Sequence, residues 1–328
     1  MSVSFGSAVL TSSMLVLFDG EMGLSRRSKR EDVTVDQARR HEMSGTIVCG
    51  VDTSEAVGEV AAVARWLADA LDERLVVAHV LGGESEQAEE PTSALRDRLT
   101  EPVEVTLVEG SPAEALLEMA GREGADFLVV GSRGRGALRS RVLGSVSREL
   151  ATKARCPVVI VPPERSIEAR AGAEGSIVCG VDGSAHSISA ARVAARLATA
   201  LGERLIVVHA LMGAKAVASY LGARASNPPL SAQSDARTRL AGEIVEEAVS
   251  HLDHDAVGVV EPGAPWEVLQ SVADREAGRM LVIAARGKGA VPAALFGSVA
   301  ARLSASTTRP LVVIPEAAEL STAPGGRE

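Results

Sequence analysis

The same pattern occurs twice in this sequence, and this repeat constrains the fold more than any other feature. The segment TIVCGVD at 46–52 returns as SIVCGVD 130 positions later. Further along, RCPVVIVP at 155–162 returns as TRPLVVIP, now 153 positions later. The chain therefore consists of two homologous halves, and the second carries 23 additional residues between His209 and Gly263.

Each half alternates short β-branched runs with helical stretches. The runs lack polar alternation, which is typical of strands buried on both faces of a parallel sheet. We therefore expect an α/β fold of two tandem doubly wound, Rossmann-like domains, each with a five-stranded parallel sheet. In the first half the expected strands are 46–52, 74–80, 103–109, 126–131 and 157–161, and the expected helices are 54–71, 112–123 and 144–154.

The additional residues of the second half predict a longer helix near 232–251, preceded by a flexible, proline-containing segment at 212–230. The first half has only a turn or two at the corresponding place, near 93–99. The apolar stripe expected along the long helix consists of Leu240, Ile244, Ala248 and Leu252.

The domain boundaries follow from the repeat. We expect domains at 45–165 and 175–316, a linker at 166–174, and a disordered tail at 317–328. Residues 1–44 are expected to be a disordered tail or to precede the true start at Met43, and a weak amphipathic helix in them stays open. Their apolar run is short and precedes its basic residues, the reverse of a secretory signal.

The composition of the chain argues against some classes of binding partner. Aromatic residues make up only 2% of the chain, too few for a surface on which the bases of single-stranded nucleic acid would stack. The formal net charge is −9, which is also unlike a general nucleic-acid-binding protein. We expect no nucleic acid and no membrane among the partners. The three cysteines have no metal-ligand spacing, and we expect them to be reduced thiols in a cytoplasmic protein.

The loop GSRGRGALRSRVLGSV at 131–146 holds four glycines, four arginines and no acid. It runs from a buried strand to a helix that begins near Gly144. Helix N-termini and glycine-rich backbone suit phosphate, so a polyphosphate cradle is one interpretation. A glycine-rich turn with a solvated basic face is the other. The P-loop motif and the dinucleotide motif GxGxxG after the first strand are both absent.

The spacing Gly131-x2-Gly134-x9-Gly144-Ser145 resembles the G-2x-G-9x-G-[S/T] ATP-binding motif of the universal stress protein family. The resemblance covers 45–162 and 175–315 and includes the VD and HV pairs after the first two strands. It implies a tandem, ATP-binding member of that family, with domains of the adenine nucleotide alpha hydrolase-like type.

This resemblance also implies roles for individual residues. Asp52 would contact the adenosine part, the backbone of Val80 would bind the adenine edge, and Gly131 would lie against the ribose. The phosphates would be lined by Gly134, Gly144, Ser145 and Val146, with Gly50 and Arg133 completing the site. The counterparts in the second half are Gly180, Asp182, Ala210, Ala284, Gly287, Gly297, Ser298 and Val299. ATP would bring Mg²⁺, held by its phosphates and water rather than by a protein cage.

Several polar residues have simpler interpretations. Asp52 and Asp182 could cap the helices that follow them. His79 and His209 are expected to be packed strand-end residues. The neighbouring histidines at 251 and 254 are expected to form a solvated helix end rather than half of a metal site.

The second half departs from the motif. Ala284 replaces the first glycine, and its methyl is expected to crowd a ligand or demand a small shift. Two basic residues, Arg286 and Lys288, stand where the first loop has four, and Pro292 stiffens the loop. We expect both halves to bind ATP and the first to bind it more tightly.

The sequence favours a nucleotide-responsive stress and regulatory module with little or no catalysis, because no general base or nucleophile pair accompanies the loop. A slow Mg-dependent ATPase or nucleotidyl-transfer enzyme and a non-binding structural scaffold are the alternatives. The apolar fifth strands at 157–161 and 310–314 would pair within one chain, and a homodimer is possible. The protein partner is unknown.

Overall fold

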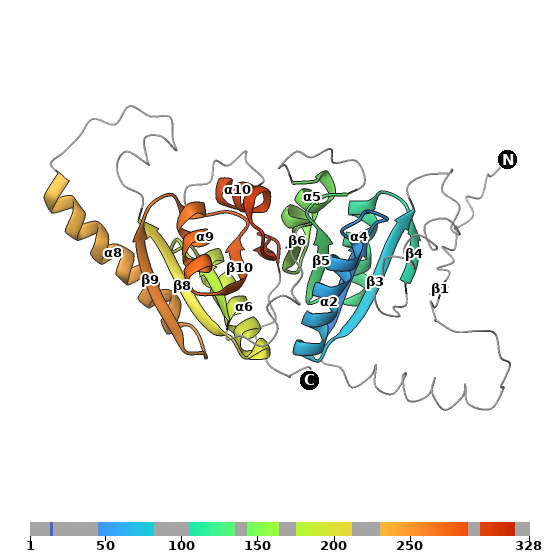
Figure 1. The fold of residues 1–328 in the computed structure, drawn as a ribbon, viewed down its shortest axis with the longest axis horizontal. Helices are drawn as coiled ribbons and strands as arrows, with labels where there is room; N and C mark the ends of the chain where they lie inside the picture. Colours follow the sequence, from blue (N-terminus) through green and yellow to red (C-terminus); the bar gives the residue numbers. More distant parts are fainter. Residues whose placement is uncertain are drawn as a thin grey trace, which may run out of the picture.

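Both halves contribute to one continuous sheet of 11 strands, with the order β1-β4-β3-β2-β5-β6-β11-β10-β7-β8-β9 (Figure 1). The structure is a computed structural model that describes residues 14–15, 45–81, 105–134, 143–163, 175–211, 230–287 and 296–318. Within each half the five strands are parallel and the first strand lies at the centre, which confirms the doubly wound class.

The bounds of the elements follow the repeat closely. In the first half they are β2 (Thr46–Val51), α2 (Val57–Leu71), β3 (Arg74–Leu81), β4 (Val105–Glu109), α4 (Pro112–Glu123), β5 (Phe127–Gly131), α5 (Ser145–Lys153) and β6 (Val158–Val161). In the second half they are β7 (Ser176–Gly180), α6 (Ala185–Leu201), β8 (Arg204–Leu211), α8 (Leu230–Ser250), β9 (Ala256–Pro262), α9 (Pro265–Arg275), β10 (Gly278–Ala284), α10 (Ser298–Ser306) and β11 (Leu311–Ile314).

Helices cover both faces of the sheet, and each face has one core that runs through both halves. Helices α2, α6 and α8 pack on one face, and α4, α5, α9 and α10 pack on the other (Figure 1). The strands supply fully buried aliphatic side chains to both faces, which explains why their sequences lack polar alternation. The two halves thus share their hydrophobic burial.

The junction between the halves is formed by β6 and β11, which pair antiparallel with Val159 opposite Val312. Both strands are fully buried. An apolar edge strand left open would be a template for association, and here each fifth strand covers the other.

An ion pair between a half-exposed arginine and a buried glutamate crosses the same junction on the side of α2 and α6. Arg196 of α6 pairs with the fully buried carboxylate of Glu73, lies 3.5 Å from Asp126, and sits 5.5 Å from the ring centroid of Phe127. Tryptophan occupies the position equivalent to Arg196 in the first half. The contact is therefore asymmetric, because only the second half supplies a cation to the first.

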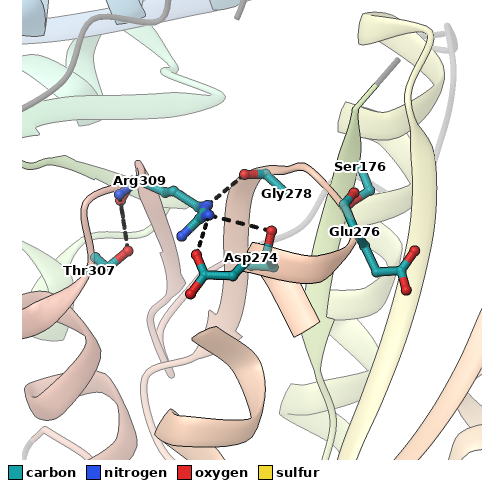
Figure 2. A network of polar contacts seen from close by, with 7 residues as sticks. Ser176, Asp274, Glu276, Gly278, Thr307 and Arg309 are labelled. Atoms are coloured by element: carbon teal, nitrogen blue, oxygen red, sulfur yellow. Dashed lines mark hydrogen bonds and ion pairs between the residues drawn. The ribbon is translucent and has the colours of Figure 1, made fainter. Parts of the chain in front are cut away.

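The amino end of β11 is held by the polar contacts of Arg309 (Figure 2), whose side chain is 8% exposed. The guanidinium donates to the carbonyl of Gly278 over 2.6 Å and to the carboxylate of Asp274 over 2.6 Å. A longer contact of 3.4 Å reaches the carbonyl of Ala273 at the end of α9. Arg309 thus ties β11, the start of β10 and the end of α9 together. The equivalent residue of the first half is Cys156.

The stripe expected on the long helix is wrong at one position. Leu240 is 56% exposed, whereas Ala241, Val245 and Ala248 are buried against β8 and β9. The face toward the sheet is thus rotated by about one residue. The close packing is visible at Gly258, where an added Cβ would lie 2.5 Å from Val245 Cγ1.

Part of the predicted organisation lies outside the described residues. This applies to the linker at 166–174, the segments 93–99 and 212–229, the tail from 319 onward, and most of residues 1–44. Within the last of these, Met14–Leu15 form β1, which pairs antiparallel with β4 at Val105 and Thr106.

Candidate ligand-binding site

The described part of the first half contains a cavity of about 640 Å³ at the carboxyl ends of β2, β3 and β5. This is the edge where open α/β sheets place ligands. All nine residues that the sequence marks in this half line it, namely Gly50, Asp52, Val80, Gly131, Arg133, Gly134, Gly144, Ser145 and Val146. Whether they contact a nucleotide stays a prediction.

The floor of the cavity includes Gly50, where the absence of a side chain allows close packing. A Cβ at Gly50 would lie 2.6 Å from Leu116 Cδ1, so the central strand and helix α4 approach each other closely only because the residue is glycine. Leu116 and Val80 are part of an apolar wall, which suits the flat face of a heterocycle.

Asp52 lies directly after the central strand and organises the turn that follows. Its Oδ1 accepts a hydrogen bond from the Ser54 amide over 3.0 Å, and a Cβ at Gly134 would lie 2.9 Å from its Oδ2. The glycine loop therefore passes directly over this carboxylate. Asp52 does not cap helix α2, whose N-cap is Ala56.

Asp182 forms the same turn in the second half, accepting from the amide and hydroxyl of Ser184 over 3.0 and 2.6 Å. Ser184 in turn caps α6 by accepting from the Ser187 amide over 3.2 Å. The capping interpretation is thus wrong for both aspartates, because each holds a turn before the helix.

Helix α5 directs its amino end at the cavity. Its N-cap is Gly144, which has no side chain to offer, and the amides of Ser145 and Val146 have no acceptor among the described residues. Gly144 donates to the Ser132 carbonyl over 2.9 Å, and the Ser147 hydroxyl donates to the Gly131 carbonyl over 2.6 Å. These bonds fix the loop, so the helix end presents free donors and a positive dipole to an anion.

His79 is a packed strand-end residue. Its side chain is 1% exposed, and its Nδ1 lies 2.9 Å from the Val51 carbonyl oxygen. His209 repeats this with Nδ1 2.8 Å from the carbonyl oxygen of Val181. The ring therefore ties two adjacent strands in each half, although His79 also reaches the cavity wall.

The described ranges hold no group of three or more histidine, cysteine, aspartate or glutamate residues placed to bind an ion. His251 contacts the Glu247 carbonyl oxygen over 2.7 Å and His254 contacts the Thr199 hydroxyl over 3.1 Å, both on an exposed surface. Both histidines thus lie on the exposed surface at and just after the carboxyl end of α8.

The second half reproduces the frame of this site. A Cβ at Gly287 would collide with the Asp182 carboxylate, as at Gly134 and Asp52, and Gly297 is the N-cap of α10. Gly180 approaches Leu269 as Gly50 approaches Leu116. The remaining predicted residues lie at the strand and helix ends equivalent to those of the first half.

The alanine that replaces the first glycine is accommodated by a second substitution. A Cβ at Gly131 would lie 3.3 Å from Val60 Cγ2 and 3.3 Å from the Arg133 carbonyl oxygen. In the second half Ala190 stands in place of Val60, and Ala284 packs against the core that contains it. The smaller side chain leaves room beside α6, so the Ala284 methyl need not displace the backbone on which a ligand would lie.

The motif did not mark several lining residues. Ser54, Val57, Pro112, Leu116 and Ser147 also line the cavity. Ser54 could have been found, because serine recurs two positions after the aspartate in both halves. The basic residues of the loop beyond Gly134 and Lys288 of the second loop lie outside the described residues.

The structure is a duplicated doubly wound α/β protein with a cavity at the carboxyl edge of the sheet in its first half. The model of the universal stress protein family matches residues 82–162 and 175–315, together more than half of the chain. The chain belongs to the universal stress protein family, and the family domain occurs in it twice.

Individual relatives agree with this assignment. A universal stress protein of Thermus aquaticus is 36% identical over 136 residues, which cover 36% of this chain and 99% of the relative. Universal stress protein Rv2005c of Mycobacterium tuberculosis is 29% identical over 211 residues, covering 64% of this chain and 68% of the relative. The structure of a universal stress protein from Archaeoglobus fulgidus is similar in fold, with a TM-score of 0.52, 16% identity, and coverage of 83% and 97%. Among the described residues, no helix has both the length and the apolar character needed to cross a membrane.

Proposed function

We propose that the chain binds ATP in the cavity of its first half and acts as a nucleotide-responsive stress module with little or no catalysis. The observation that supports this most is the uncapped amino end of α5, which directs free amides into the cavity beside Arg133. Backbone donors, a helix dipole and a guanidinium together form a site for phosphate.

The shape of the cavity fits a nucleotide. Its volume of about 640 Å³ lies within the range usual for cofactor sites. An apolar end formed by Val80, Leu116 and Val130 would hold the adenine, and the end at Gly134 and Gly144 would hold the phosphates. Asp52 lines the same cavity, and its carboxylate lies against Gly134 at the phosphate end.

A divalent cation would enter with the phosphates. Among the described lining residues Asp52 carries the only carboxylate, and one carboxylate does not make a cage. Mg²⁺ would therefore be bound mainly by phosphate oxygens and water, with Asp52 close enough to orient that water.

Little or no hydrolysis is expected, because the cavity lining offers no paired nucleophile and base. His79 has its Nδ1 engaged with the Val51 carbonyl, and Asp52 has one oxygen engaged with Ser54. A slow Mg-dependent ATPase or nucleotidyl-transfer enzyme, with Asp52 positioning the metal, stays an alternative that phosphate release would reveal. The second alternative is a scaffold that binds no nucleotide. The nucleotide content of the purified protein distinguishes this scaffold from a nucleotide-binding module.

The test is to denature freshly purified protein and identify the released nucleotide by chromatography. Gly134→Asp would place a carboxylate where the phosphates should lie and against Asp52, and Gly287→Asp does the same in the second half. Gly121→Asp is the matched control, because a Cβ there meets nothing within 4 Å. ATP near two per chain, lowered by one in each site variant, supports two binding sites.

Other outcomes are equally decisive. ATP lost only with Gly134→Asp would restrict ATP binding to the first half. No released nucleotide, together with a failed ATP titration, would overturn the proposal and leave a scaffold. Equal loss with Gly121→Asp would show that the effect is not local to the cavity.

A further inference from the structure

The two halves differ in the ion pairing of one arginine beside the glycine loop. In the second half, Nη1 of Arg286 lies 2.8 Å from Oε2 of Glu316 and donates a hydrogen bond to it. The arginine side chain is 23% exposed and the glutamate 56%. Glu316 comes two residues after β11, so the end of the junction strand supplies the carboxylate.

The repeat supplies the comparison. Arg133 is the equivalent of Arg286 and lines the first cavity, while Pro163 is the equivalent of Glu316. Within the described residues no ion pair involves Arg133, and a proline at 163 carries no carboxylate. The same two positions therefore hold a single cation in the first half and a neutralised pair in the second.

Both arginines occupy the same place relative to the cradle. Each directly precedes the glycine that lies against the aspartate of the central strand, Gly134 on Asp52 and Gly287 on Asp182. Each also lies on the loop that leads to an uncapped helix N-terminus. The backbone donors at the two helix ends are thus equivalent, and the pairing of the arginine distinguishes the second site in addition to Ala284.

We propose that Glu316 is a specificity-determining residue that adapts the second site to nucleoside monophosphates, while the first site takes the triphosphate. This inference rests on the proposed nucleotide-binding function. The helix N-terminus alone satisfies one phosphate group. A triphosphate carries more negative charge to the same place, meets the Glu316 carboxylate, and finds Arg286 already occupied.

The size of the effect is limited by solvent. Because Glu316 is more than half exposed, its pairing is screened, and removing it should change affinity by roughly three- to tenfold. The change should shrink at high salt, and it should act on ATP much more than on AMP.

The experiment uses the full chain with its first site disabled by Gly134→Asp and measures AMP and ATP binding by calorimetry. In this background AMP should bind at least as tightly as ATP. Adding Glu316→Gln should tighten ATP roughly three- to tenfold and leave AMP within about twofold. Glu243→Gln, which removes a carboxylate from a pair with Arg239 on the outer helix α8, is the control and should change neither.

The reverse exchange gives a second readout. With the second site disabled by Gly287→Asp, Pro163→Glu should weaken ATP binding to the first site and spare AMP. Equal effects of Glu316→Gln on AMP and ATP, or no effect, would overturn the inference while leaving nucleotide binding intact. Binding of neither nucleotide by the Gly134→Asp chain would also overturn it, and the unmodified chain would then decide whether the first site binds ATP at all.

Discussion

A buried carboxylate at the junction of the two halves should make the stability of this protein fall as the pH rises toward neutrality. The side chain of Glu73 is fully buried, and its Oε2 has no hydrogen-bond partner among the described residues. Burial raises the pKa of Glu73 from 4.5 to about 7; the nearby Arg196 lowers it and Asp126 raises it. Burial therefore outweighs the ion pair.

The direction and size of this change in the free energy of unfolding follow from proton linkage. Between pH 4.5 and about 7 the unfolded chain releases the proton of Glu73 while the native protein retains it. The stabilisation is thus fully present below pH 4.5 and is lost as the pH rises through about 7. At about 1.4 kcal/mol per pH unit, the interval corresponds to about 3 kcal/mol.

Urea unfolding of the unmodified chain and of Glu73→Gln between pH 4.5 and 8 measures this directly. The free energy of unfolding of the variant, minus that of the unmodified chain, should rise by up to about 3 kcal/mol across the interval, since other titrating groups cancel. Arg196→Met is the companion variant. It removes the cation that lowers the pKa of Glu73, so the loss of stability should extend to higher pH and become larger in total. The reasoning would be refuted if the difference in free energy of unfolding between Glu73→Gln and the unmodified chain did not change with pH.

Three further perturbations test the packing. Ala190→Val should destabilise the chain by about 1–3 kcal/mol because it returns the larger side chain beside Ala284, and adding Ala284→Gly should restore most of the loss in thermal unfolding. Arg309→Met should cost about 2–4 kcal/mol, since it leaves buried carbonyls without their donor; a loss below 0.5 kcal/mol by urea unfolding would contradict the role in Figure 2. Burial raises the pKa of Cys49 and of Cys156 to about 12, so a thiol reagent at pH 8 should label neither until the chain unfolds, and labelling of the native protein would count against that burial.

The repeat made most of the fold predictable from the sequence. Two copies of one pattern locate each strand twice, and helix 112–123 matches α4 at both ends because Pro112 begins it and Gly124 ends it with a φ of 59°. Periodicity was less reliable on α8. Apolar residues there follow two adjacent stripes, one through Leu240 and one through Ala241, and only the packing against β8 and β9 selects the second.

The candidate site was predictable where glycine is needed and less so elsewhere. Glycines recur at fixed spacing because the backbone passes close to Asp52 and to Leu116, and this leaves a readable pattern. The apolar wall consists of ordinary aliphatic residues that look like any core position. The accommodation of Ala284 by Ala190 was invisible, because the two residues belong to elements far apart in the sequence that only the fold brings together.

The polar contacts at the amino ends of the strands indicate how the two halves have come to depend on each other. In the second half Glu203 is held by Arg279 of its own domain, at 2.5 Å. In the first half Asp126 stands where Arg279 would be, so Glu73 faces another carboxylate and takes its cation, Arg196, from the other half. A buried carboxylate without a cation is costly. The second half therefore supplies its own cation at this end, whereas the first half takes its cation from the second. Because one chain carries both halves, Arg196 is supplied to Glu73 in every molecule.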